Sequence, residues 1–293
     1  MPLIKLKSSC WFFVALLLAA CTPQEGVEEI QSRLTAEHGV IIRSGEPGSF
    51  YIAPYGEKEA KLPVGKMFAA NPSALPESLR GIEDALSHYP KGFVASLIKA
   101  IFISGELWFD GKPAGGTYHH SWIIVASTTN KNKESNYEAA LYGVHHELSS
   151  FVLNKQPITG MVWGELMPQG WSAATSYAKA LGVNWSDEPD YINGFLSKYA
   201  ETSVENDFNT YAEFAFSNPG ELVKFANSYP VVAKKLRLFI DAYSRISPAM
   251  AGIFEQTSLI AAAAAPEPFS KVDSVQIMAI PKPTVIYQED KSQ

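Results

Sequence analysis

The sequence predicts a helix-rich α+β fold with a small β-containing region near its N-terminus. Strand patterns gather between residues 39 and 127, and helical patterns dominate the chain after them. A buried strand, predicted over Ser121 to Ser127, comes directly before the strongest helix pattern. Strands and helices do not alternate regularly, so the order favours an α+β plan over a series of βαβ units.

The other elements of the first half are predicted from periodicity and turn residues. Alternating apolar and polar residues around Gly45-Glu46-Pro47-Gly48 predict a hairpin, and Tyr89-Pro90 closes a helical pattern. The expected elements are, in order, a hairpin at 39–55, a helix at 76–88, a helical stretch at 93–101, a strand or strand pair at 102–109 and a turn at Gly115-Gly116-Thr117.

The central helix is predicted over Ser135 to Leu153. Ser135 and Glu138 have the spacing of a capping box, which marks the start of the helix. The face opposite the apolar stripe carries small residues around one imidazole, His146, where a solvent-facing helix would carry Lys, Glu or Arg. We therefore expect a second covered surface there, such as the floor of a cleft. The apolar stripe consists of Tyr137, Leu141, Val144, Leu148 and Phe151, and the opposite face of Ala139, Gly143, His146 and Ser150.

The second half is predicted to be mainly helical. Thr202 and Glu205 have the spacing of a second capping box, and Asn218-Pro219 supplies the start of another helix. The expected elements are irregular structure plus a helix at 156–182, and helices at 189–200, from 202 to 216, after 218 and at 231–246.

Residues 1–20 are predicted to be a lipoprotein signal peptide. Lys5 and Lys7 precede an apolar core that is short for a transmembrane helix, and the segment ends in Leu18-Ala19-Ala20-Cys21. This resembles the bacterial lipoprotein signal, in which Cys21 becomes the acylated first residue. The predicted organisation is a signal peptide at 1–20, a tether at 21–36, one domain at 37–255 and a low-complexity tail at 256–293.

Composition narrows the location and the partners of the mature protein. Cys10 lies inside the leader and Cys21 at its end, so no thiol remains for a disulfide. The net charge of −6 and the lack of a basic patch argue against nucleic acid as a partner. Thr22, rather than Asp, follows the lipid cysteine, which resembles lipoproteins sent to the outer membrane. We expect attachment to the bacterial cell envelope through lipid on Cys21, facing the periplasm or the cell surface.

His146-Glu147 is the first half of the zincin motif H-E-x-x-H. In that motif, histidines four residues apart hold zinc on one helix face, and the glutamate activates a metal-bound water. Ser150 stands here at the second histidine position. A hydroxyl is a poor zinc ligand beside imidazole or carboxylate, so the motif is half present.

Several segments together are similar to bacterial zincin-type zinc metallopeptidase lipoproteins, and distantly to the catalytic domain of anthrax lethal factor. They are the helix ending at Tyr89-Pro90, Gly115-Gly116-Thr117 leading into the strand 122–126, the His145-His146-Glu147 helix, and the stretch 194–200 before the acidic segment 205–213. The resemblance covers roughly residues 75 to 245. It implies a zincin-like domain in which an edge strand offers itself to an extended peptide.

The resemblance assigns roles residue by residue. His146 matches the first zinc ligand and Glu147 the general base, while the acidic helix supplies a carboxylate ligand. Two alignments place that carboxylate position at Asn206 or at Glu213, and Glu213 is preferred because it lies on a polar helix face. His145 and Asp207 are the alternative metal ligands, and His119-His120 could approach the cleft from the edge strand.

These assignments lead to one expected function and two alternatives. The expected function is that of a lipid-anchored zinc metallopeptidase that hydrolyses peptide bonds with metal-activated water, with zinc as cofactor and a peptide or protein as substrate. The first alternative is a degenerate zincin that keeps its cleft and serves as a peptide-binding or scaffold lipoprotein. The second is a structural envelope protein with an incidental His-His-Glu. Serine hydrolysis is disfavoured because no G-x-S-x-G occurs.

Overall fold

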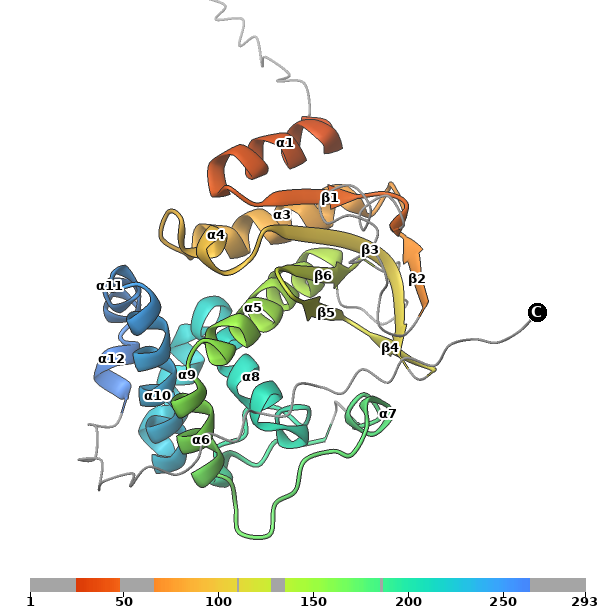
Figure 1. Cartoon of the computed structure of the whole chain (residues 1–293). Helices are drawn as coiled ribbons and strands as arrows, with labels where there is room; N and C mark the ends of the chain where they lie inside the picture. Colours follow the sequence, from red (N-terminus) through yellow and green to blue (C-terminus); the bar gives the residue numbers. More distant parts are fainter. Residues whose placement is uncertain (1–24, 48–65, 110, 128–134, 185–186, 264–293) are drawn as a thin grey trace, which may run out of the picture.

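A mixed six-stranded sheet forms the N-terminal half of the described chain, and helices form the C-terminal half (Figure 1). The computed structural model describes residues 25–47, 66–109, 111–127, 135–184 and 187–263. The predicted helix-rich α+β class is confirmed at this level. Within these residues, no helix has the length and hydrophobicity needed to cross a membrane.

The sheet is built around one long strand, β3 (Ala100–Phe109). The first half of β3 lies between β1 and β6 and is parallel to both, and its second half pairs in antiparallel fashion with β2 and β4. Strand β5 pairs with β6 and ends the order β1-β3-β6-β5. The shorter strands are β1 (Ile41–Ser44), β2 (Lys66–Ala69), β4 (Lys112–Ala114), β5 (Gly116–His119) and β6 (Trp122–Ala126).

The alternation of side chains along the strands gives the sheet two apolar faces. Ile101, Ile103, Ile123 and Val125 pack into the large core that the helices share, whereas Phe102, Trp122 and Ile124 belong to a smaller cluster on the other face. The helices are α1 (Val27–His38), α3 (Leu75–Ser87), α4 (Phe93–Leu97), α5 (Asn136–Asn154), α6 (Pro157–Glu165), α7 (Tyr177–Ala180), α8 (Val204–Ser217), α9 (Pro219–Ser228), α10 (Pro230–Ile246), α11 (Ala249–Gln256) and α12 (Leu259–Ala262).

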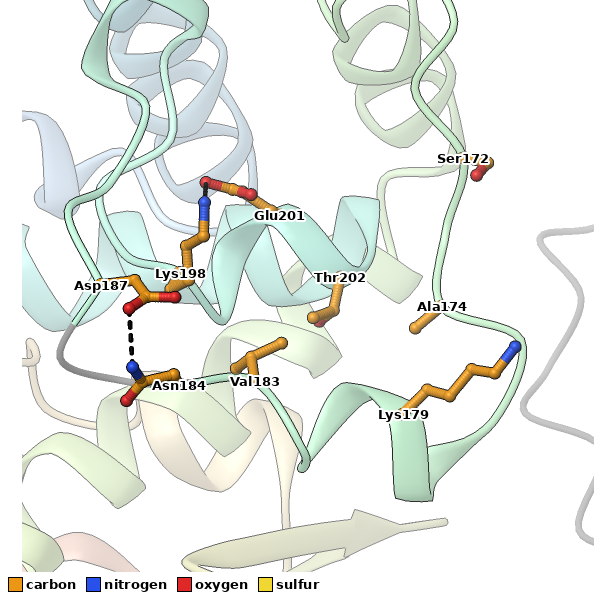
Figure 2. A pocket seen from close by; sticks show the side chains of 9 residues that line it. All are labelled: Ser172, Ala174, Lys179, Val183, Asn184, Asp187, Lys198, Glu201 and Thr202. Atoms are coloured by element: carbon orange, nitrogen blue, oxygen red, sulfur yellow. Dashed lines mark hydrogen bonds and ion pairs between the residues drawn. The ribbon is translucent and has the colours of Figure 1, made fainter.

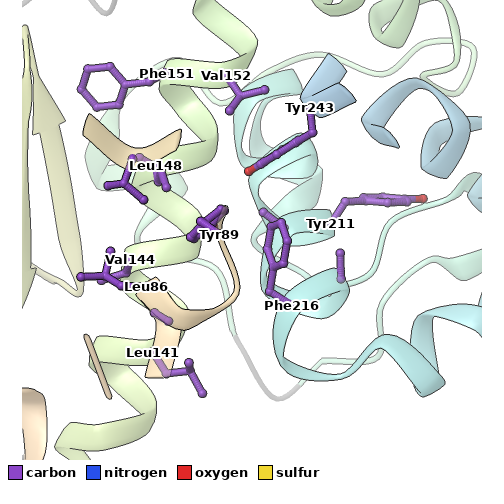
Figure 3. Close-up of a cluster of buried hydrophobic side chains, with 14 of the residues drawn as sticks. Leu86, Tyr89, Leu141, Val144, Leu148, Phe151, Val152, Tyr211, Phe216 and Tyr243 are labelled. Atoms are coloured by element: carbon purple, nitrogen blue, oxygen red, sulfur yellow. The ribbon is translucent and has the colours of Figure 1, made fainter. Parts of the chain in front are cut away.

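Helix α5 lies in the middle of the large core. It begins after Ser135, whose side chain accepts a hydrogen bond from the Glu138 backbone, so the predicted capping box is confirmed. One side of α5 packs on the sheet and the other on α8 and α10 (Figure 3). The predicted second covered surface therefore exists. Helix α3 approaches α5 closely at Gly81, where a Cβ atom would lie 2.2 Å from the backbone oxygen of Tyr137.

Four local predictions are wrong. The helical stretch predicted at 93–101 ends at Leu97, because Ala100 and Ile101 already pair with β1 and β6 as part of β3. The turn predicted at Gly115–Thr117 is a strand from Gly116 onward, because Gly116 and Thr117 are paired with β6. The helix predicted at 189–200 is replaced by irregular chain and two short 3-10 helices, η1 (Tyr191–Asn193) and η2 (Ala200–Thr202), because Gly194 adopts a left-handed conformation that ends η1. The cap of α8 is Ser203 rather than Thr202.

Other predicted segments lie partly or fully outside the described residues. The signal peptide, Cys21 and most of the tail 256–293 lie outside them, as does the second arm of the hairpin at 39–55. The described first arm, β1, pairs in parallel with β3. Ordered helix continues past the predicted boundary at residue 255, because α12 packs through Leu259, which is fully buried.

Candidate functional site

Polar side chains line the contact between α5 and α8, and they meet in antiparallel order. His146 on α5 contacts Glu213 on α8, and further along, Ser149 and Ser150 contact Asn209. The spacing is four residues on both helices, so each pair lies one helical turn from the next. His146 therefore lies next to the acidic helix, and Glu213 is the residue of that helix that it contacts.

His146 and Glu213 form a direct ion pair. His146 Nδ1 lies 2.6 Å from Glu213 Oε1, and the two side chains are only 13% and 26% exposed. Burial opposes the charged form of His146, but the hydrogen bond and the charge of Glu213 outweigh it and raise the pKa of His146 to about 9. The imidazole is therefore a cation at neutral pH, with both ring nitrogens protonated.

Ser150 is part of a buried hydrogen-bond network. Asn209 Nδ2 donates to Ser150 Oγ at 2.8 Å, and Ser149 Oγ donates to Asn209 Oδ1. All three residues are almost fully buried. The second histidine position of the motif is thus occupied by a hydroxyl whose neighbour across the helix contact is a neutral amide.

Glu147 lies beneath strand β5. A Cβ atom added to Gly116 would lie 2.8 Å from Glu147 Oε1, so the glycine leaves room for the carboxylate. Glu147 is 8% exposed and has no hydrogen-bond partner among the described residues. Burial is the main cause that raises the pKa of Glu147 to about 7; the charges of Glu205 and Glu213 add to it, and that of His146 opposes it.

We expect the Gly116→Ala variant to be destabilised by about 1–3 kcal/mol, the usual cost of overpacking. The new methyl group would meet both Glu147 Oε1 and the backbone oxygen of Ile124 at 2.8 Å. Denaturant unfolding would measure the change. Gly115→Ala is the matched control, because a Cβ atom there has no neighbour within 4 Å. Equal stabilities of the two variants would contradict the close fit of Glu147 under β5.

Strand β5 forms the edge of the sheet beside Glu147. The Ala126 N–H donates to the Gly115 carbonyl at 2.8 Å, so in this antiparallel pair Thr117 and His119 are the next residues bonded to β6. The N–H and C=O groups of Gly116 and Tyr118 therefore point away from β6. No other described strand pairs with them.

Tyr118 and Glu205 complete the polar cluster at this edge. The Tyr118 ring packs against Phe151 of α5 with ring centroids 5.2 Å apart, and its hydroxyl accepts a hydrogen bond from Asn154 at 3.3 Å. Burial raises the pKa of Tyr118, and the charge of Glu205 raises it further. Glu205 lies two turns before Glu213 on α8, and its charge also raises the pKa of Glu147.

His145 belongs to the core and not to this cluster. It is fully buried, its Nδ1 lies 2.8 Å from the Tyr89 hydroxyl, and its ring stacks on Phe216. Burial lowers the pKa of His145 well below its ordinary value, so the ring is neutral. A residue adjacent to His146 on a helix points about 100° away from it, and here that direction leads into the core.

Asp207 is held elsewhere in the core. Its Oδ2 accepts hydrogen bonds from Lys235 Nζ and from Trp163 Nε1, each at 2.7 Å. Burial raises the pKa of Asp207 to about 6, and the charge of Lys235 opposes that shift. Asp207 is thus a partner of a buried cation, away from His146.

His119 and His120 do not approach the cluster. The His119 ring stacks on Trp122, which belongs to the apolar cluster on the sheet face away from α5. The His120 ring lies edge-on to His119 with ring centroids 3.9 Å apart. Alternation along β5 places Tyr118 on the α5 side and His119 on the other side.

The donors at the site do not fit the zinc ion that the motif implies. Tetrahedral zinc sites use three protein ligands when catalytic, drawn from Cys, His, Asp and Glu. Among the described residues, no three such side chains are grouped so that they could hold a metal ion. His146 Nδ1 and Glu213 are paired with each other, and Ser150 is tied to Asn209.

A cavity of about 320 Å³ lies elsewhere, between α7 and η2 (Figure 2). None of the predicted site residues lines it. Two of its polar pairs are internally satisfied, Lys198 with Glu201 at 2.8 Å and Asn184 with Asp187 at 2.6 Å. The cavity and the polar cluster on α5 are therefore separate features of the molecule.

No protein-family model, no curated protein and no solved structure matches this chain. The resemblance to zincin-type lipoproteins accordingly stays a prediction from the residues quoted above.

The sequence analysis assigned no role to Glu205, Asn209 or Tyr118, which the structure brings to this site. Glu205, Asn209 and Glu213 recur every fourth residue on α8, so they form one polar helix stripe, and this spacing is visible in the sequence. Tyr118 is harder to identify, because its place depends on the pairing of β5 with β6.

Proposed function

We propose that this chain is a lipid-anchored protein of the bacterial cell envelope whose degenerate zincin-like site binds an extended peptide segment without hydrolysing it. The observation that carries the proposal is the 2.6 Å ion pair between His146 and Glu213. In this pair the two residues that would hold the metal bind each other. Ser150 offers no replacement ligand, because it is hydrogen-bonded to Asn209.

The open edge of β5 supports the peptide as the ligand. Outward-facing N–H and C=O groups on a sheet edge pair readily with an added strand, and the hydrogen bonds of the main chain give affinity. The polar groups of Gly116 and Tyr118 are available for such pairing within the described residues, and Gly116 lies next to the Glu147 carboxylate. A bound segment would thus run past the polar cluster.

Zinc analysis of the purified full chain tests the proposal. We expect zinc well below one ion per chain, and an unfolding temperature that a chelator does not change. Incubation with unstructured peptides should leave them uncleaved, while an N-methylated peptide, which lacks backbone donors, should bind more weakly than its parent.

A zinc metallopeptidase is the second candidate, favoured by the closeness of His146 and Glu213. That function predicts stoichiometric zinc that is lost in His146→Ala and retained in Glu147→Gln, together with peptide cleavage that Glu147→Gln abolishes. Either result would contradict the proposed non-hydrolytic function.

The lipid anchor makes a separate prediction. Cys21→Ser is expected to move most of the protein from the membrane fraction to the soluble fraction, because no acyl chain can then be attached. Cell fractionation and immunoblotting would measure this. Cys10→Ser, inside the predicted leader, is the matched control and should stay with the membrane. Membrane retention of Cys21→Ser would contradict anchoring through that residue.

A further inference from the structure

Glu147 is a buried acid without a hydrogen-bond partner in the part of the chain that the structure describes. It is 8% exposed and accepts no hydrogen bond from the described residues. A carboxylate in such a place is costly unless a cation or a proton compensates it. The other buried acid of the core, Asp207, shows the usual solution, because Lys235 and Trp163 both donate to it. Glu147 has no equivalent.

The charges around Glu147 leave the site negative. Three charged groups of the described chain shift the pKa of Glu147: His146, Glu205 and Glu213. His146 alone among them is a cation, and it is already paired with Glu213 at 2.6 Å. Glu147 and Glu205 are therefore left without a positive partner from the described residues.

This negative charge lies under the open edge of β5. The Glu147 carboxylate reaches the place that a side chain of Gly116 would fill, and Glu205 acts on Tyr118, the other residue whose backbone faces outward. A strand added to this edge would lie about 4.8 Å from β5, and every second side chain would point to the α5 side. A long side chain in that position can reach the two carboxylates.

We propose that the peptide bound at β5 is selected for a lysine or arginine side chain, whose charged group lies between Glu147 and Glu205. An ammonium or guanidinium group supplies both the positive charge and the hydrogen-bond donors that Glu147 lacks. The inference rests on the proposed peptide-binding function and names its ligand class. With Phe, Leu or Glu in that position, only a proton could compensate the Glu147 carboxylate, whose pKa is about 7.

Binding of matched peptides to the full chain tests the selection. The probes are fluorescent, N-acetylated and C-amidated Thr/Val peptides about seven residues long, longer than the four residues of β5, with a central lysine, norleucine or glutamate. Norleucine keeps most of the chain length of lysine and removes its charge. We expect the lysine peptide to bind at least about tenfold more tightly than the norleucine peptide, a preference of about 1.4 kcal/mol.

Two substitutions locate the preference, and one serves as a control. Glu147→Gln and Glu205→Gln should each reduce the lysine-over-norleucine ratio severalfold, mainly by weakening the binding of the lysine peptide. Glu255→Gln, an exposed residue of α11, removes the same charge and should leave the ratio intact. Circular dichroism would verify that each variant is folded. If one of the two glutamine variants does not fold, the other still tests the proposal.

The outcomes separate the inference from the proposed function. Equal binding of lysine and norleucine peptides, with weaker binding after N-methylation, would overturn the selection and leave peptide binding standing. A lysine preference that both glutamine variants retain would also overturn it, because the preference would then come from general surface charge. Failure of every peptide to bind would overturn both.

Discussion

Lys235→Met is expected to lower the free energy of unfolding by about 3–5 kcal/mol, the usual cost of removing one partner from a buried ion pair. Lys235 and Asp207 are both 0% exposed, and their charged atoms lie 2.7 Å apart. Without the ammonium group, Asp207 would be a carboxylate in an apolar core, and one of its oxygens, Oδ1, already has no hydrogen-bond partner among the described residues. The large effect comes from this stranded charge.

The contacts of Lys235 stabilise its ion pair with Asp207. Its three donors are satisfied by Asp207 Oδ2 at 2.7 Å, the Gly194 carbonyl at 3.2 Å and the Asn193 carbonyl at 3.3 Å. The Nζ atom also lies 4.3 Å from the centre of the Phe195 ring. The pair thus holds the chain around Gly194 against α10 and against α8, the helix that carries Glu213.

Guanidinium unfolding of the variant would measure the effect, with Lys224→Met as the control. Lys224 is an exposed lysine of α9, and its loss should change stability by less than about 0.5 kcal/mol. The double variant Lys235→Met/Asp207→Leu should recover much of the loss, because it removes the stranded charge. If Lys235→Met were no more costly than Lys224→Met, Asp207 would not depend on this partner.

The features that follow from local patterns could be predicted from the sequence. The start of α5 depends on Ser135 and Glu138, three residues apart, and its amphipathic stripe spans a few turns. The contact of His146 with Glu213 spans 67 residues; helix periodicity placed each residue outside the apolar stripe of its helix, but their closeness was expected only from the resemblance. Helix periodicity constrains such faces strongly.

The features that depend on tertiary pairing could not be predicted. Asp207 has the same sequence character as Glu213, and only the fold brings Lys235 to one of them. The partner of His145 is Tyr89, 56 residues away in the connection between α3 and α4. Strand β5 has four residues, one of them glycine, so its pattern resembles a turn until β6 lies beside it.

The chain is expected to lose about 2–3 kcal/mol of stability as the pH rises from about 6.5 to about 9, through deprotonation of His146. Burial disfavours the charged ring, but Glu213 outweighs burial and raises the pKa of His146 from 6.5 to about 9. A group with a raised pKa binds its proton more tightly in the folded state. Its contribution is complete below the unfolded-state pKa and disappears above the folded-state value.

Glu213→Gln isolates this contribution. Without the Glu213 charge and its hydrogen bond, burial opposes the charged ring of His146 and only the weaker effects of Glu147 and Glu205 still favour it, so the decline between pH 6.5 and 9 should shrink sharply. Glu147 also gains a raised pKa, but its contribution is lost between pH 4.5 and about 7, so Glu147→Gln should flatten the lower part of the curve instead. Urea unfolding at several pH values would separate the two pH ranges.

Glu221→Gln, an exposed change on α9, should keep the wild-type dependence of stability on pH. A decline above pH 7 that survives in Glu213→Gln would mean that the His146–Glu213 pair does not form in solution, and the argument that the two residues replace a metal would fail with it.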